Sequence, residues 1–481
     1  MKVKSLTVGP ILGAVTESNA RIFGRGNDWS SSNSFLKWWN NIFNTKQYFY
    51  GVARISLSGT SNFTTPNIFR LNPIFDMSGV NIFNDLSPDQ EYEYQMGWIS
   101  SNWENPARIK ETPLDWSGIK IYKFKSASAQ KNQPRSFIFG SCRYLLRLRS
   151  GSYFDSRGDK TFRSVLKQID AQRETDALIM LGDQIYADDL NFVSPDKRID
   201  QFFQRYQEVF SQPYIRELMA RIPTYMTLDD HEIEDNWSAR ATQKDWVTLF
   251  PVAIHAYLTY QLSHSPLFEL SADRSKIVGT PSKLWYSFTD GCCDFFIMDA
   301  RTERYFSDIE EDKRIISVEQ MESLKEWLAD DSGKIKFIGS SVPFFPDFKE
   351  TDADKWSGFL YQRTEILDFI FTNKIKQVVF LSGDVHCSMS AELICDEEPD
   401  FKVVSIISSA FFWPYAHNQA KSFQLEGELK TLSAHKYHLT NAEPVNSIDN
   451  FTRISVDPKA LKAEVFSRKG ELVSTKKHIF S

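Results

Sequence analysis

Four short apolar stretches of this 481-residue chain end in small residues that are followed at once by side chains able to bind metal ions. Such a run predicts a buried strand, and glycine at its end lets the backbone approach an ion closely. In open α/β sheets, ligands bind beyond the carboxyl ends of the strands. The four stretches are Phe139–Arg143, Leu181–Tyr186, Leu228–Glu232 and Leu381–His386.

The side chains at these strand ends are of the types that hold two metal ions. Asp183 follows the apolar run Ala177–Met180, and Tyr186, three residues on, can turn back to the same point. Asp384 and His386 are two residues apart, so they project to the same side of an extended segment. Carboxylates and an imidazole suit a pair of ions about 3.5–4 Å apart. We expect Asp183 to bridge the two ions.

Each motif also has a simpler explanation when it is taken alone. Asp384 and His386 could form an ordinary hydrogen-bonded pair, and Asp229–Glu232 could begin a helix whose first turn is acidic. Cys142 could be a buried inert thiol, and Arg143 could be a surface charge. Because all four motifs fall at predicted strand ends, we favour a metal site.

The composition excludes several classes of protein. The formal charge of -6, from 56 basic and 62 acidic residues, gives no electrostatic footprint for nucleic acid or for an anionic membrane. Five cysteines without a CxxC pattern do not make a disulfide framework or a zinc finger. No stretch reaches the roughly 18 apolar residues of a membrane span. The sequence therefore predicts a large globular protein.

The first fifteen residues superficially resemble a signal peptide. Their apolar part is broken by Gly9 and Pro10 and continues as an alternating pattern, and it has no twin arginine. We interpret this segment as a first strand and expect a cytoplasmic protein, with export of a longer precursor as the open alternative.

The chain changes character near residue 130. Residues 1–128 contain β-rich runs separated by Gly, Asn, Ser and Pro, which predicts an all-β domain, and Leu86–Tyr94 resembles the turn and strand of a fibronectin type III sandwich. In residues 136–424 strands alternate with helices, which indicates an α/β layered fold. We expect residues 425–481 to add C-terminal strands to that domain.

The motif series resembles that of the PhoD-like (alkaline phosphatase D) phosphatases, in the calcineurin-like metallophosphoesterase superfamily. The matching motifs are Gly140–Arg143, Gly182–Asp188, Asp229–Glu232 with Asn236 and Trp237 after it, and Ser382–His386. The resemblance implies a metallophosphoesterase core, a β-sandwich with flanking helices, preceded by a fibronectin III-like or immunoglobulin-like domain.

The same resemblance implies a ferric ion, Fe³⁺, and a second, divalent ion, expected to be Ca²⁺. The iron would be held by Cys142, Asp183, Tyr186 and His386. The second ion would share Asp183 and add Asp384, together with either Asp230 or Asn236. Both candidates for that last ligand stay open.

The implied activity is hydrolysis of a small phosphate ester, a monoester or a diester, by a metal-bound hydroxide. Arg143 would neutralise charge on the phosphoryl oxygens, and His231 would stabilise the transition state or protonate the leaving oxygen. These are the two residues to which we assign catalytic roles.

Two other functions remain open from the sequence. The same site could serve a phospholipase D-like diesterase or a nucleotide or polyphosphate hydrolase. Basic residues near the site would suit a polyanion, although they could equally form a solvated face: Arg143, Arg147, Arg149 and Lys160. Alternatively, the chain could be a non-catalytic binding protein that acts through its β domain.

Overall fold

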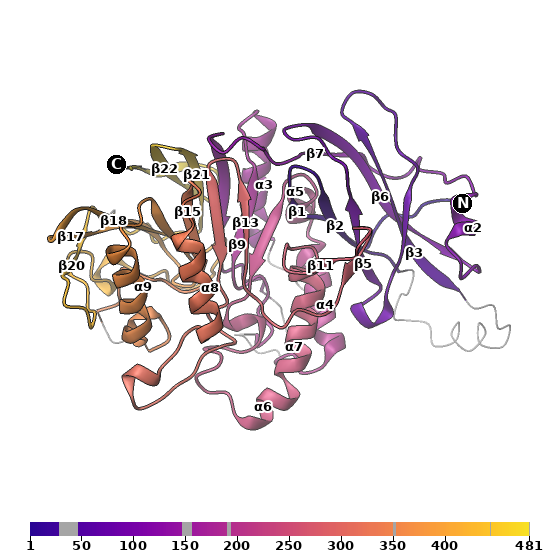
Figure 1. The fold of residues 1–481 in the computed structure, drawn as a ribbon. Coiled ribbons are helices and arrows are strands. Elements are labelled where there is room, and N and C mark those ends of the chain that lie inside the picture. Colours follow the sequence, from indigo (N-terminus) through magenta and orange to yellow (C-terminus); the bar gives the residue numbers. More distant parts are fainter. Residues whose placement is uncertain (28–46, 147–155, 190–193, 350–352, 443, 481) are drawn as a thin grey trace. The chain divides into compact units, whose positions relative to one another are not determined.

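The computed structural model describes residues 1–27, 47–146, 156–189, 194–349, 353–442 and 444–480 (Figure 1). It divides into two compact units. The first comprises Met1–Ala127, Phe210–Pro223 and Ser263–Thr280, and the second comprises Ser128–Val209, Thr224–Leu262 and Pro281–Ser481. Two segments from the middle of the chain thus belong to the N-terminal unit, which their local sequence did not indicate.

The first unit is built mainly from two antiparallel sheets. One contains β1 (Val8–Val15), β2 (Ala20–Arg25) and β5 (Ser78–Phe83). The other contains β4 (Asn67–Arg70), β3 (Tyr48–Leu57), β6 (Glu91–Ser101) and β7 (Tyr122–Lys125). Alternate side chains from both sheets, such as Leu12, Ile22, Ala53 and Tyr94, form one core. The strands agree with the all-β character predicted for this region.

Short elements complete the first unit. They are η1 (Pro73–Phe75), α2 (Ala107–Lys110), α5 (Pro213–Met219) and the two-residue strands β11 (Glu269–Leu270) and β12 (Ile277–Val278). Before α5 the chain forms α4 (Ile199–Phe210), which ends three residues ahead of Pro213. Pro213 begins α5 because proline lacks the N–H group that would continue the preceding helix.

The second unit contains two larger sheets. The six-stranded sheet has the order β10 (Thr224–Thr227), β9 (Ala177–Leu181), β8 (Arg135–Gly140), β21 (Asn450–Asp457), β22 (Ala460–Ser467) and β23 (Leu472–Ile479). The eight-stranded sheet has the order β13 (Tyr286–Asp290), β14 (Cys293–Ile297), β15 (Ile335–Ser340), β16 (Val378–Ser382), β18 (Glu398–Ser408), β17 (Ser388–Cys395), β20 (Tyr437–Thr440) and β19 (Gly427–Glu428).

The two sheets of the second unit pack face to face. Phe137 on β8 makes edge contacts with Phe295 on β14 and Phe337 on β15, with ring centroids 5.3 and 5.2 Å apart. The neighbouring residues Phe296 and Ile338 point to the opposite face, as the two-residue period of a strand requires. The arrangement is a layered α/β sandwich, as the sequence predicted.

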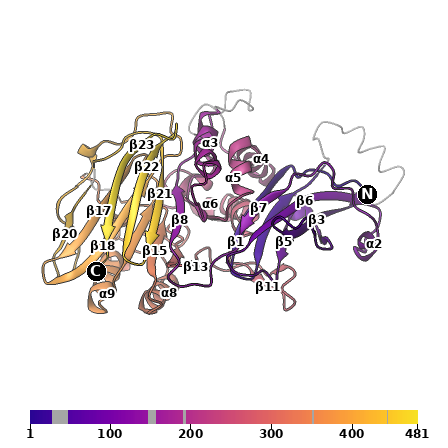
Figure 2. The ribbon, with the colours of Figure 1, turned by 90° about the horizontal axis from the view of Figure 1, so that it is seen from above.

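Helices cover the outer faces. The helices α8 (Val318–Ala329) and α9 (Leu360–Thr372) lie side by side on the eight-stranded sheet (Figures 1 and 2). On the six-stranded sheet, Arg453 of β21 donates a hydrogen bond at 2.9 Å to Gln168 of α3 (Arg157–Asp170). Within the described residues, no helix is both long and apolar enough to cross a membrane.

The topology brings several strand ends to one edge of the sandwich. The strands β8, β9 and β10 are parallel neighbours, and so are β14, β15 and β16. Because β8 is central in its sheet, the C-terminal strand β21 pairs with its other side in the antiparallel sense. Residues 450–479 therefore complete the sheet that carries three of the four sequence motifs.

Candidate metal centre

Each strand-end motif directly follows a strand of the second unit. Cys142 follows β8, Asp183 follows β9, Asp230 follows β10 and Asp384 follows β16. The last residues of β9 and β10, Leu181 and Thr227, are register partners, so these two strands end at the same level. The register explains why residues far apart in the sequence meet at one point.

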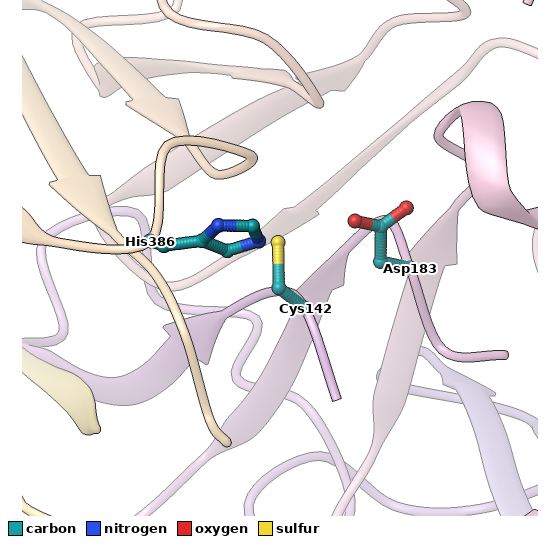
Figure 3. Close-up of side chains that lie close together, drawn as sticks. All are labelled: Cys142, Asp183 and His386. Carbon is teal, nitrogen blue, oxygen red and sulfur yellow. The ribbon is translucent and has the colours of Figure 1, made fainter. Parts of the chain in front are cut away.

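The first cluster consists of Cys142, Asp183 and His386 (Figure 3). One potential ligand atom from each residue lies within 4.8 Å of the others. Tyr186 joins them, because its hydroxyl donates a hydrogen bond at 3.1 Å to Oδ2 of Asp183. The structure therefore brings together all four side chains for which an iron site was predicted.

Two further clusters continue from the first. Asp183, Asp230 and His231 form one, and Asp229, Asp230 and Asp384 form the other, with potential ligand atoms in each within 4.8 Å. Asp183 belongs to the first and second clusters, and Asp230 belongs to the second and third. The donors thus form one continuous array, because neighbouring clusters share a carboxylate.

The backbone at the array is held in an unusual conformation. The φ angles of Cys142, Asp183, Asp384 and His386 are 54, 56, 68 and 48°, in the left-handed region that non-glycine residues rarely adopt. Such conformations cost free energy and persist where the surrounding structure enforces them. Gly182, with φ 98°, must be glycine, because a Cβ atom there would lie 2.4 Å from Cβ of Asp229.

The electrostatics of the array fit bound cations. Burial raises the pKa of the Cys142 thiol and of the Tyr186 hydroxyl well above their usual ranges, and the charge of Asp183 raises both further. Burial lowers the pKa of His386 to about 3, which keeps the imidazole in the neutral form that binds metals. In the described part of the chain, Oδ1 of Asp183 and Oδ1 of Asp230 are buried without a hydrogen-bond partner. A cation would satisfy these oxygens and favour the ionised donors.

Comparison with known proteins agrees with this geometry. Residues 146–464 match the model of the PhoD-like phosphatase family. The chain belongs to the PhoD-like phosphatases. Alkaline phosphatase D of Bacillus subtilis (strain 168) is 24% identical over 266 residues, which are 47% of this chain and 44% of that relative. The match thus spans less than half of the length of the relative.

Solved structures show the same fold. A structure of PhoD superposes with a TM-score of 0.69 at 16% identity, over 99% of this chain and 89% of the other. Purple acid phosphatase PPD1 from yellow lupin (Lupinus luteus) seeds gives a TM-score of 0.59 at 12% identity, over 99% and 74% of the two chains. The metallophosphoesterase-like architecture is therefore established for this PhoD-like chain.

His231 is held beside the donors by an acidic partner. Its Nδ1 lies 2.8 Å from Oδ2 of Asp188, and its ring lies 4.3 Å from the ring of Tyr186. Burial alone would lower the pKa of His231, but Asp230, Asp183 and Asp188 together raise it well above its usual value. In the described part of the chain, the hydrogen bonds of this ring are made by Nδ1, with both carboxylate oxygens of Asp188.

Glu232 fixes the loops that carry the ligands. Its carboxylate accepts hydrogen bonds from the backbone N–H groups of Asp183, Gln184 and Asp229 at 3.0, 2.7 and 2.8 Å. The side chain of Gln261 donates another at 3.0 Å. One buried carboxylate therefore connects the end of β9 to the end of β10.

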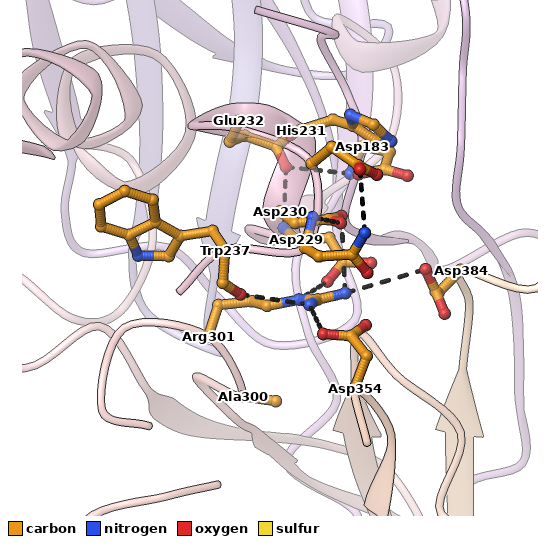
Figure 4. Close-up of polar contacts among 12 residues, drawn as sticks. Asp183, Asp229, Asp230, His231, Glu232, Trp237, Ala300, Arg301, Asp354 and Asp384 are labelled. Atoms are coloured by element: carbon orange, nitrogen blue, oxygen red, sulfur yellow. Dashed lines mark hydrogen bonds and ion pairs between the residues drawn. The ribbon is translucent and has the colours of Figure 1, made fainter. Parts of the chain in front are cut away.

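Arg301 lies within the array, although the sequence analysis did not single it out (Figure 4). Its fully buried guanidinium donates to Asp229 and to Asp354, the latter at 2.7 Å, and lies 3.5 Å from Asp230 and 3.8 Å from Asp384. A signal was present, because Asp299-Ala300-Arg301 follows the apolar strand β14 just as the four motifs follow theirs.

The guanidinium of Arg143 does not join the array. It pairs with Asp159 at 3.2 Å, donates to the carbonyl of Val209 at 2.9 Å and lies over the ring of Phe162. Only its backbone N–H reaches the array, donating to the carbonyl of Asp183 at 2.9 Å. A guanidinium held in a buried ion pair is not placed to neutralise a phosphoryl group, which argues against the predicted role.

The two candidates for the second-ion ligand differ in placement. Asp230 lies in two of the donor clusters. The backbone N–H of Asn236 donates to Oδ2 of Asp230 at 2.6 Å, and its side-chain amide donates to Asp235 at 2.9 Å. Asn236 is thus tied to Asp230 by a hydrogen bond, and both residues stay candidates for the ligand of the second ion. Arg147 and Arg149 lie outside the described residues, and Lys160 is half-buried on α3.

Proposed function

We propose that this PhoD-like chain hydrolyses phosphate esters, monoesters or diesters, with metal ions held by the donor array. One observation carries this proposal: Asp183 and Asp230 each belong to two of the three donor clusters, as carboxylates shared between neighbouring cations would. When bound, the ions would supply Lewis acidity that activates water and neutralises charge on the phosphoryl oxygens.

The donor types support particular metals. Cys142 and Tyr186 offer a thiolate and a phenolate beside Asp183 and His386, a set that favours iron in its trivalent state. Asp230 and Asp384 offer hard carboxylate oxygens, which suit Ca²⁺. We therefore propose Fe³⁺ in the first position and Ca²⁺ in the second.

Two side chains of the protein would supply the proton for the leaving oxygen and balance the charge of the carboxylates. His231, held by Asp188, would donate a proton to the leaving oxygen. Arg301 would keep the surrounding carboxylates ionised and oriented. The substrate would be a small phosphate ester that reaches the array from the edge where the strands end.

For the first unit we propose a fibronectin type III-like arrangement. The Leu86–Tyr94 segment forms a turn and the start of β6, and the Tyr94 ring is buried in the core between the two sheets. Its hydroxyl donates to the carbonyl of Ala220 at 2.7 Å.

The first experiment is metal analysis of the purified protein with a visible absorption spectrum, alongside hydrolysis of 4-nitrophenyl phosphate and bis(4-nitrophenyl) phosphate. We expect the protein to contain iron and to hydrolyse at least one of the two esters. We also expect a broad charge-transfer band that changes in Tyr186→Phe and in Cys142→Ala. Cys395→Ala is the matched control for Cys142→Ala, because Cys395 is a buried free thiol outside the donor clusters of the described residues. Protein that stays inactive after iron and calcium are restored would refute the proposal.

A further inference from the structure

A lysine ammonium group lies at one end of the donor array. Nζ of Lys355 forms ion pairs with Oδ2 of Asp384 and, at 3.0 Å, with Oδ2 of Asp354. The Lys355 side chain is only 13% exposed. The positive charge of Lys355 is therefore already paired with Asp384, which belongs to the third donor cluster.

The backbone of this lysine is held in place by the next residue in the chain. Trp356 is fully buried, and its indole N–H donates to the hydroxyl of Ser340, at the end of β15, at 3.1 Å. Its ring packs edge-on against Phe344, with centroids 5.1 Å apart. The loop is thus anchored one residue after Lys355, and this anchor directs the ammonium toward Asp384.

Two positively charged side chains, Arg301 and Lys355, contact the third cluster, and they differ in how firmly they are held. Arg301 is fully buried and contacts Asp229, Asp230, Asp354 and Asp384, so it cannot leave without exposing several buried charges. Lysine carries a compact charge on a flexible stem. Of the two, the lysine contacts fewer of these carboxylates, so it is the cation that can turn away from Asp384.

From this difference we infer that Lys355 competes with the second metal ion for Asp384, so that this ion binds as an exchangeable, lower-affinity cation. The inference rests on the proposed function, because it assumes a cation at Asp384. A divalent ion and an ammonium group repel each other at contact distance, so binding of the ion requires the lysine to move.

Asp354 remains an ion-pair partner for Lys355 when the ammonium group leaves Asp384. Oδ1 of Asp354 is bound by Arg301 and by Arg304, at 2.7 and 2.6 Å, while Oδ2 faces Lys355. Once the ion has taken Asp384, the ammonium can keep its ion pair with Asp354. Lys355 then remains a positive group beside the site, and the exchange leaves no buried charge unpaired.

The test is the affinity for Ca²⁺, measured by calorimetric titration of iron-loaded protein. We expect Lys355→Met to bind Ca²⁺ at least about tenfold more tightly than the unmodified protein, because the competing charge is gone. Lys355→Arg, which keeps the charge, should stay within about threefold of the unmodified protein. Lys376→Met is the matched control, because it removes a lysine that pairs with exposed Asp400 at 3.1 Å, and it should leave the affinity unchanged.

The outcomes separate this inference from the proposed function. An affinity that is equal or weaker in Lys355→Met, in protein whose circular dichroism spectrum is unchanged, overturns the competition, as does an absence of Ca²⁺ binding in both proteins. Tight binding in Lys355→Met and weak or no binding in the unmodified protein supports it. These titrations need no turnover, so a chain that hydrolyses no ester would refute the proposed function and still report on Lys355.

Discussion

Arg301 and Asp229, 72 residues apart in the sequence, form an ion pair in which neither side chain is exposed to solvent. Burial raises the pKa of Asp229 to about 7, while Arg301 acts to lower it. The pair connects the segment after β14 to the segment after β10, and so joins the two sheets of the second unit within the donor array.

This pair predicts a large cost for removing the guanidinium. Arg301→Met should lower the free energy of unfolding by about 3–5 kcal/mol, because Asp229 and Asp354 would lose a buried cationic partner. Urea unfolding followed by circular dichroism measures the change. Arg198→Met is the control: that side chain is 67% exposed and pairs with Asp200 at the surface, so it should change stability by less than about 0.5 kcal/mol. Equal effects of the two substitutions would contradict the structural role.

The sharing of donors predicts different metal losses from different substitutions. Asp183→Asn should lose both ions, because Asp183 belongs to two clusters. Cys142→Ala should lose iron and keep the second ion, and Asp384→Asn should lose the second ion and keep iron. Elemental analysis gives the iron content of each protein, and calorimetric titration with Ca²⁺ tests whether the second position still binds its ion. If every variant lost both ions, the substitutions would have disrupted the whole array, and the prediction of two separate metal positions would be contradicted.

The partner of His231 predicts a shift in the pH dependence of the rate. Asp188 helps to raise the pKa of His231, and the protonated ring is the proposed proton donor. Activity should therefore fall as the pH rises through this pKa. Asp188→Asn removes a negative charge, which lowers the pKa and moves the alkaline limb to lower pH, with about a 10- to 100-fold loss of kcat. The measurement is kcat against pH at constant metal content. An unchanged alkaline limb would exclude His231 as the acid.

A buried carboxylate on β17 predicts loss of stability in acid. Burial opposes ionisation of Glu392, but hydrogen bonds from His478, Lys402 and Asn441 lower its pKa to about 2, from an unperturbed 4.5. Because the folded pKa is the lower one, the stabilisation is complete above about pH 4.5 and disappears as the pH falls toward 2. Glu392→Gln should show a smaller loss of stability between pH 5 and pH 2.5, measured as urea midpoints, than the unmodified protein.

The measured quantity is the difference in the pH dependence of the urea midpoint between Glu392→Gln and the unmodified protein. Other carboxylates titrate over the same range in both, so only the difference in slope reports on Glu392. Parallel pH profiles would show that its hydrogen bonds do not depress the pKa in the folded state.

Local patterns in the sequence determined most of the donor array. An apolar run that stops at glycine and aspartate specifies both a buried strand and a polar group at its end, and this information lies within about ten residues. The candidate ligands Cys142, Asp183, Asp384 and His386 could therefore be proposed without a structure. The helices α8 and α9 were predictable for the same reason, because their apolar spacing is local.

The tertiary structure decided which charges meet. Arg143 stands in a motif, yet its guanidinium is held by Asp159 on α3, whereas Arg301 and Lys355, which no motif included, contact the carboxylates. A long flexible side chain can reach any of several partners, so its position depends on how distant strands and loops pack together. The sequence thus determined the donors, which strand ends carry directly, and the packing of the two sheets decided the cations that accompany them.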